Sequence, residues 1–167
     1  PLGTQCTVTE TAPTQSQLLD ASYAWGATPA VQTVTVNERD GAVTATVTNS
    51  ITRVYGTLAI TKIVQALGGV NGANTTFSGT WSCQYGNSDP LTGTWTRTGA
   101  GAATLSGPTD QLLIGSVCTV TETDKSPNQP NPNDSSYVWG PETVTGPVTL
   151  TVAAPNGRVN VTNPVRR

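Results

Sequence analysis

Apolar and polar residues alternate along most of this chain, and the spacing typical of amphipathic helices is nearly absent. The alternation predicts a series of short strands in the second two-thirds of the sequence. They lie at about 57–65, 76–85, 92–97, 101–106, 111–123, 136–145, 147–153 and 157–163. Asn156-Gly157, between the last two predicted strands, is typical of a two-residue hairpin turn. Short strands at this spacing predict an all-β, immunoglobulin-like sandwich.

The chain also repeats itself. The segment GTQCTVTE at residues 3–10 returns as GSVCTVTE at residues 115–122. The Val-Thr-Asn run that ends at Asn49 returns as the run that ends at Asn163. Self-similarity at a fixed period is the signature of tandem repeats, so we interpret the chain as an array of one domain type.

The repeat predicts where the domains begin and end. Residues 57–167 hold one complete repeat, which is large enough to form its own hydrophobic core. Residues 1–56 match only the C-terminal part of a repeat, so the first repeat is incomplete. We expect residues 50–56 to be the linker between the two.

Three polar residues of the complete repeat fall on strand faces that are otherwise apolar. Lys62 shares its face with the leucine, isoleucine and valine residues of the first strand. Glu122 shares its face with Cys118 and Val120, and Asn163 shares its face with the valines of the last strand. Buried and unpaired, such groups would cost several kcal/mol, so we expect the three side chains to meet inside the sandwich.

An amine, a carboxyl and an amide in a dry interior can react with one another. Burial disfavours the charged form of a lysine, so Lys62 loses its proton more readily. A neutral amine held against the Asn163 amide is arranged for aminolysis, with Glu122 as the acid and base. The product is an isopeptide bond from Lys62 to Asn163, formed with loss of ammonia.

A simpler alternative stays open for the same residues. Lys62 could extend along the sandwich to its edge and form an ordinary ion pair with Glu122. The residue types and their phase on the strands are compatible with both arrangements.

The three cysteines follow the repeat. Cys83 and Cys118 lie in the complete repeat, and Cys6 is the counterpart of Cys118 in the first one. One disulfide per repeat accounts for the odd number, and a Cys83–Cys118 bond would indicate an oxidising, extracytoplasmic location. Two buried free thiols are the alternative.

The first repeat holds part of the same polar set. Glu10 corresponds to Glu122 and Asn49 to Asn163, whereas the matching lysine would lie before Pro1. We expect either that residues 1–56 are a fragment of a longer protein or that another copy of the chain supplies the missing strands.

Composition excludes several classes of function. The net charge of −2 and the absence of basic clusters argue against nucleic acid as a partner. The chain has no histidine, which is the commonest general base and metal ligand, so we expect no turnover enzyme. We expect neither a cofactor nor a metal site, because the aspartates show no calcium-loop spacing. No stretch reaches the roughly 20 apolar residues of a membrane span.

The order of these motifs resembles the CnaB-type stalk domains of Gram-positive pilins and adhesins. The resemblance rests on Lys62 in the first strand, the Gly-Ser-Val-Cys-Thr-Val-Thr-Glu run that ends at Glu122, and the terminal Val-Thr-Asn163. With its cysteines, the pattern is similar to repeats of large actinobacterial-type surface proteins, although a cysteine pair is not part of the general CnaB pattern.

This resemblance implies a sandwich fold and a Lys–Asn isopeptide bond catalysed by the glutamate. It implies a structural role in the stalk or fibre of an extracellular, cell-wall attached adhesin or pilin-like protein. The expected partners are neighbouring repeats of the same protein.

A second functional hypothesis is a module that binds a glycan or a host protein through its surface loops. Trp95, between threonines, is the aromatic residue that we expect to be most exposed and therefore the candidate ligand contact. The loops near 86–95 and 124–135 would form the binding surface.

Overall fold

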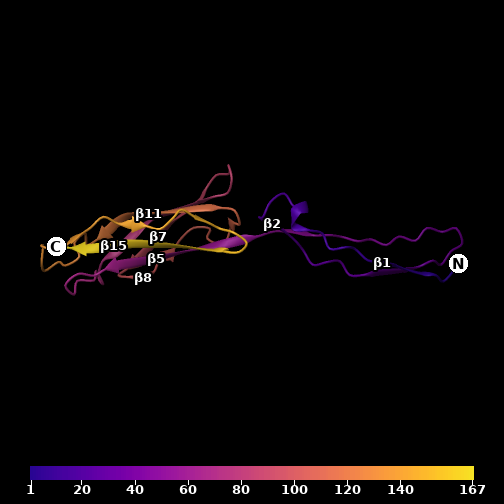
Figure 1. The fold of residues 1–167 in the computed structure, drawn as a ribbon, viewed down its shortest axis with the longest axis horizontal. Coiled ribbons are helices and arrows are strands. Elements are labelled where there is room, and N and C mark those ends of the chain that lie inside the picture. Colours follow the sequence, from indigo (N-terminus) through magenta and orange to yellow (C-terminus); the bar gives the residue numbers. More distant parts are fainter. The chain divides into compact units, whose positions relative to one another are not determined.

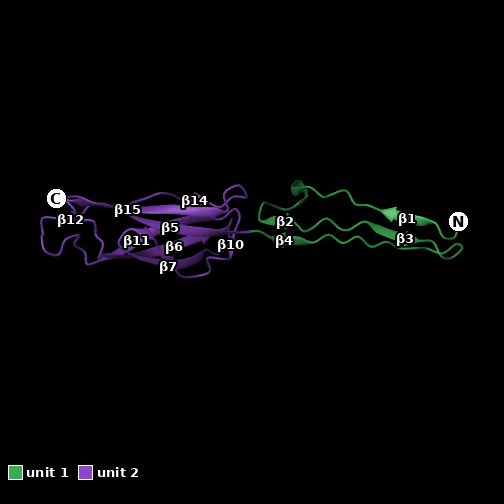
Figure 2. Cartoon of the chain, turned by 90° about the horizontal axis from the view of Figure 1, so that it is seen from below, with its two compact units in different colours: residues 1–54 green, residues 55–167 purple.

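The computed structural model describes residues 1–167, and nearly all of its regular structure is β-strand (Figure 1). The only helix is a single 3-10 turn at Gln15–Gln17. No helix of the protein is long and apolar enough to cross a membrane. The chain divides into two compact units, which we call unit 1 (Pro1–Val54) and unit 2 (Tyr55–Arg167) (Figure 2).

Unit 2 is built from two sheets. One sheet has the strand order β14-β11-β6-β7-β9, and the other has the order β10-β5-β15-β12, with β13 paired to β15 and β8 paired to β5. The bounds are β5 Tyr55–Gln65, β6 Thr76–Gln84, β7 Leu91–Thr98, β8 Gly101–Ala102, β9 Thr104–Leu105, β10 Leu112–Leu113, β11 Val117–Ser126, β12 Val138–Trp139, β13 Thr143–Val144, β14 Val148–Thr149 and β15 Asn156–Arg166.

Alternating side chains of both sheets form one core. Every second residue of β5, β6 and β15 is buried over most of the strand, as the sequence pattern predicts. The largest fully buried side chains include Trp81 and Phe77 from one sheet and Ile60 from the other. Unit 2 is therefore an all-β sandwich, which confirms the predicted fold class.

The first and last strands of unit 2 lie side by side. β5 and β15 pair in parallel from Thr57 opposite Asn156 to Gln65 opposite Pro164, whereas all other strand pairs are antiparallel. Parallel neighbours require a crossover connection, and here almost the whole domain forms that crossover. The two ends of the domain are thus brought into one sheet.

The predicted hairpin at Asn156-Gly157 is wrong. Both residues belong to β15, and the chain turns earlier, where the backbones of Thr151 and Ala154 bond to each other. β14 pairs with β11 in one sheet while β15 lies in the other, so this connection crosses between sheets. Gly157 serves packing instead, because a Cβ there would lie 2.7 Å from the Leu150 side chain.

The boundary between the units also differs from the prediction. Ile51–Arg53 form strand β4 and Tyr55 begins β5, so most of the expected linker at residues 50–56 is strand. The alternation of Ile51, Arg53 and Tyr55 continues without a turn residue into β5.

Unit 1 consists of two separate strand pairs. β1 (Gln5–Val8) pairs with β3 (Gln32–Thr35), and β2 (Tyr23–Trp25) pairs with β4. Ser22 is the one buried residue of this unit. Two-stranded sheets without a core are marginally stable on their own.

The predicted disulfide is present in unit 2. Cys83 of β6 and Cys118 of β11 are paired neighbours on adjacent strands of one sheet and are bonded, at a sequence separation of 35. Cys6 is free and exposed. The alternative of two buried free thiols is therefore excluded.

Replacing both bonded cysteines by serine (Cys83→Ser, Cys118→Ser) should lower the free energy of unfolding of unit 2 by about 3–4 kcal/mol. The bond closes a loop of 35 residues and so restricts the unfolded chain. Urea denaturation followed by tryptophan fluorescence measures this change. Cys6→Ser is the matched control, expected within about 0.5 kcal/mol of the native chain. A double variant as stable as this control would contradict the prediction.

Candidate functional site

The three polar residues predicted to point inward come from three strands of unit 2. Lys62 lies on β5, Glu122 on β11 and Asn163 on β15. Their exposed fractions are 1%, 7% and 0%. Because β5 and β15 are in one sheet and β11 is in the other, the cluster bridges the two layers of the sandwich.

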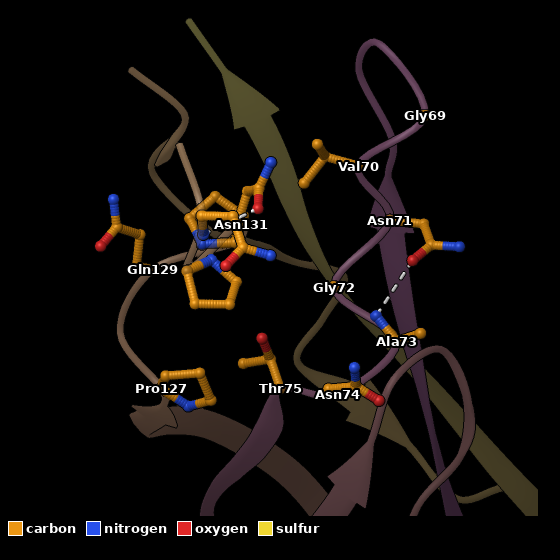
Figure 3. A pocket seen from close by; sticks show the side chains of 13 residues that line it. Gly69, Val70, Asn71, Gly72, Ala73, Asn74, Thr75, Pro127, Gln129 and Asn131 are labelled. Atoms are coloured by element: carbon orange, nitrogen blue, oxygen red, sulfur yellow. Dashed lines mark hydrogen bonds between the residues drawn. The ribbon is translucent and has the colours of Figure 1, made fainter. Parts of the chain in front are cut away.

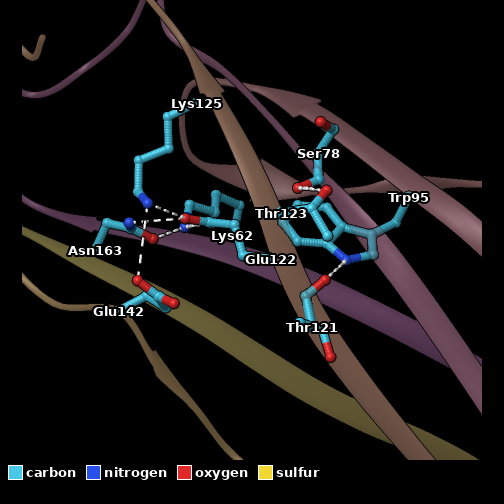
Figure 4. Close-up of polar contacts among 9 residues, drawn as sticks. All are labelled: Lys62, Ser78, Trp95, Thr121, Glu122, Thr123, Lys125, Glu142 and Asn163. Carbon is cyan, nitrogen blue, oxygen red and sulfur yellow. Dashed lines mark hydrogen bonds and ion pairs between the residues drawn. The ribbon is translucent and has the colours of Figure 1, made fainter. Parts of the chain in front are cut away.

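The three side chains form a closed ring of hydrogen bonds (Figure 4). Lys62 Nζ donates to Glu122 Oε2 at 2.5 Å and also to Asn163 Oδ1. Asn163 Nδ2 donates to Glu122 Oε1 at 2.9 Å. The three side chains thus meet, as predicted. The ion pair between Lys62 and Glu122 that the simpler alternative expects is present, but it is fully buried and does not lie at the sandwich edge.

Burial sets the electrostatics of the lysine. Desolvation lowers the pKa of Lys62 below its ordinary value of 10.5, and the hydrogen bond and charge of Glu122 oppose this shift only in part. The Nζ atom also lies over the face of the Phe77 ring, 4.1 Å from its centre, a cation–π contact that favours the ammonium form and does not reverse the shift. At a given pH, a larger fraction of Lys62 is therefore in the neutral amine form than for a solvent-exposed lysine.

Two further charged residues reach this cluster and were not predicted from the sequence. Lys125 Nζ lies 3.1 Å from Glu122 Oε1 and 3.7 Å from Glu142 Oε2. In a regular strand, residues three apart point to opposite faces, but β11 has an irregularity between Glu122 and Asp124. This irregularity turns Lys125 toward Glu122. No motif in the sequence predicts the irregularity.

The predicted ligand contact at Trp95 is wrong. Trp95 is fully buried, and its indole nitrogen donates to the Thr121 carbonyl oxygen at 3.1 Å. The neighbouring threonines suggested exposure, but in an alternating strand they take the outer face and leave the inner face to the tryptophan. Trp95 is a core residue.

A polar hollow of about 310 Å³ lies between two loops of unit 2, residues 69–75 and 127–133 (Figure 3). Its lining is rich in asparagine, glycine and proline and contains no charged side chain. None of the residues of the buried cluster lines this hollow, so the two features are distinct. The protein contains no group of three or more His, Cys, Asp or Glu side chains that could hold a metal ion.

Unit 1 retains the acid and the amide of the cluster. Asn49 Nδ2 donates to Glu10 Oε1 at 2.6 Å, between the same atom types that join Asn163 to Glu122. Residues 1–54 contain no lysine. Cys6, the counterpart of the bonded Cys118, is exposed.

The fold and the site together define a β-sandwich domain with a buried lysine–glutamate–asparagine cluster. The chain belongs to the family described as "Domain of unknown function (DUF5979)", whose model matches residues 1–52 and 58–166. The two matched stretches fall in unit 1 and unit 2, respectively. No curated protein and no solved structure matches the chain.

The lowered pKa of Lys62 predicts how stability depends on pH when the amine is free. We choose Asn163→Ala, which removes the amide that the amine could attack. Between the lowered pKa of the folded state and 10.5 in the unfolded state, the unfolded chain binds more protons. The free energy of unfolding should therefore rise with pH as the pH approaches 10.5 from below.

Denaturant titrations at several pH values measure this dependence. The matched control is the double variant Asn163→Ala, Lys62→Met, which keeps every other titrating group. The difference between the two variants reports Lys62 alone. A difference that stays constant or changes in the opposite direction would contradict the assignment.

Proposed function

We propose that unit 2 is a structural domain that cross-links itself through an isopeptide bond between Lys62 and Asn163, with Glu122 as the acid and base. The observation that carries this proposal is the closed hydrogen-bond ring among the three buried side chains. Its members are a potential nucleophile, a carboxamide and a carboxyl group that contacts both of their nitrogens.

The positions of the two Glu122 oxygens suit the proton transfers of this reaction. Oε2 takes a proton from Lys62 Nζ, which leaves a neutral amine beside a protonated carboxyl group. The amine attacks the side-chain carbonyl carbon of Asn163, a C–N bond forms, and the bond from that carbon to Nδ2 breaks. The carboxyl group returns a proton to Nδ2, which lies at Oε1, and the nitrogen leaves as ammonia. The Glu122 carboxylate then takes the remaining extra proton from the former amine nitrogen, which completes the secondary amide, and the departing ammonia can carry this proton away as ammonium.

The balance needs no external reagent, because the Lys62 amine and the Asn163 amide give one secondary amide and one ammonia. Holding the reacting groups together replaces a bimolecular encounter with an intramolecular step. Burial lowers the competition from water, and the desolvation that comes with it favours the neutral amine. One glutamate is therefore sufficient for a single self-directed reaction.

The position of the bond suits a load-bearing role. It would join β5 to β15, the first and last strands of the domain, which are parallel neighbours. A pull on the two ends of unit 2 would then pass through the covalent bond, and the 101 positions from Lys62 to Asn163 would carry no load. Without the bond, the force would act on the backbone hydrogen bonds between these two strands.

We propose on these grounds that the chain is part of a stalk or fibre of an extracellular bacterial surface protein, of the adhesin or pilin-like kind. The Cys83–Cys118 disulfide supports an oxidising location, because such bonds are rare in the cytosol. The match of one family model to both units supports neighbouring repeats as the structural partners. The role is mechanical, and we assign no substrate that is turned over.

Intact mass spectrometry under reducing conditions tests the bond. The native chain should weigh about 17 Da less than its sequence, because one ammonia is lost. Lys62→Arg and Asn163→Ala should restore the full mass, and Glu122→Gln should slow the loss at least about tenfold. Lys125→Arg changes the only other lysine and is the matched control, expected to keep the loss. A native chain of full sequence mass would refute the cross-link.

Single-molecule stretching tests the mechanical role. With handles on both termini, unit 2 of the native chain should not lengthen, whereas Lys62→Arg should unfold in one clear event. Reducing the disulfide in this variant should add 35 residues, or about 120 Å at roughly 3.4 Å per residue. Equal extension of the native chain and the variant would show that the bond bears no load.

A further inference from the structure

Glu122 is a buried carboxylate that contacts two ammonium groups (Figure 4). Its Oε2 atom accepts a hydrogen bond from Lys62 Nζ at 2.5 Å, and its Oε1 atom lies 3.1 Å from Lys125 Nζ. Oε1 also accepts a hydrogen bond from Asn163 Nδ2 at 2.9 Å. Two cations and one amide therefore compensate the charge of Glu122, whose side chain is fully shielded from solvent.

The two lysines differ in their distance from solvent. The side chain of Lys62 is fully buried, whereas that of Lys125 is 19% exposed. Lys125 Nζ also lies 3.7 Å from Oε2 of Glu142, whose side chain is 42% exposed. Lys125 thus lies between the buried carboxylate and a carboxylate at the surface.

The proposed cross-link removes two of the three groups that compensate Glu122. Lys62 Nζ becomes the neutral nitrogen of a secondary amide, and Asn163 Nδ2 leaves as ammonia. Lys125 is neither the nucleophile nor the leaving group, so its ammonium group stays at Oε1. No other cation forms an ion pair with Glu122.

We propose that Lys125 is the counter-ion of Glu122 in the cross-linked domain and allows this glutamate to leave the reaction as a carboxylate. The inference rests on the proposed function and adds one residue to it. Lys125 becomes necessary when Lys62 loses its charge, because a buried carboxylate without a cation takes up a proton instead.

The reaction balances with and without this cation, and the position of one proton distinguishes the two cases. In the native chain the new amide forms, the Asn163 nitrogen leaves as ammonium, and Glu122 remains a carboxylate beside Lys125. Without the Lys125 charge, the same nitrogen leaves as neutral ammonia and the proton stays on Glu122. The protonation state of Glu122 in the product therefore reports the role of Lys125.

The test labels the side-chain carboxyl carbon of glutamate with carbon-13 and records NMR spectra at neutral pH. The chain has only four glutamates, Glu10, Glu38, Glu122 and Glu142, and the signal that Glu122→Gln removes identifies Glu122. In the cross-linked native chain we expect the signal of a carboxylate. In cross-linked Lys125→Met it should move to the position of a protonated acid, and Lys125→Arg should keep the carboxylate position, because arginine retains the charge.

The matched control uses chains that cannot form the bond. In Asn163→Ala, Lys62 keeps its charge and its contact with Glu122, so we expect a carboxylate both with and without the added Lys125→Met. Intact mass is measured on the same samples. The native chain and Lys125→Met should each have lost about 17 Da, and the Asn163→Ala chains should not. A purely structural role of Lys125 would not depend on the bond in this way.

A chemical variant avoids the case in which Lys125→Met fails to fold. In the cross-linked native chain Lys62 is consumed, so Lys125 carries the only remaining side-chain amine. Acetylation of the folded, cross-linked chain removes its charge. The Glu122 signal should then move to the position of a protonated acid, as in Lys125→Met.

The mass and the NMR signal separate the two possible failures. A native chain of full sequence mass refutes the proposed function, and this inference with it. The inference alone is overturned if the native chain is cross-linked but Glu122 stays a carboxylate after the Lys125 charge is removed. It is also overturned if Lys125→Met folds without cross-linking, which would place Lys125 in the bond-forming step.

Discussion

The structure of unit 2 depends on burying one lysine. Taking an ammonium group out of water costs several kcal/mol unless charge and hydrogen bonds compensate it. Lys62 meets this requirement with the Glu122 carboxylate on one side and the Asn163 carbonyl oxygen on the other. The compensation is incomplete, because burial still lowers the pKa of Lys62. The same imbalance that makes the charged form costly makes the amine a better nucleophile.

The topology determines what the proposed Lys62–Asn163 bond would do under a mechanical load. A bond between two side chains in the middle of a sheet would stabilise a fold, but it would not connect its ends. Here the first and last strands are parallel neighbours, so the cluster lies on the shortest path between the two ends of unit 2. Unit 1 contains the same acid–amide contact, between Glu10 and Asn49.

Alternation alone predicted much of the fold and of the site. The strands, the inward direction of Lys62, Glu122 and Asn163, and the facing cysteines all follow from the period of two along a strand. The same rule places Trp95 on the inner face of its strand, although the threonines on either side of it suggest exposure. Lys125 could not be predicted, because it reaches Glu122 only through a local break in the alternation.

The sequence by itself determined which residues face inward and that acid and amide recur in both units, because these properties depend only on local backbone geometry and on the repeat. It did not determine which strands become neighbours. The tertiary structure placed β5 beside β15, carried the chain from one sheet to the other at the Thr151–Ala154 turn, and brought Lys125 and Glu142 to the cluster. Which strands become neighbours depends on packing between segments that are distant in sequence. A local sequence pattern does not contain the energies of that packing.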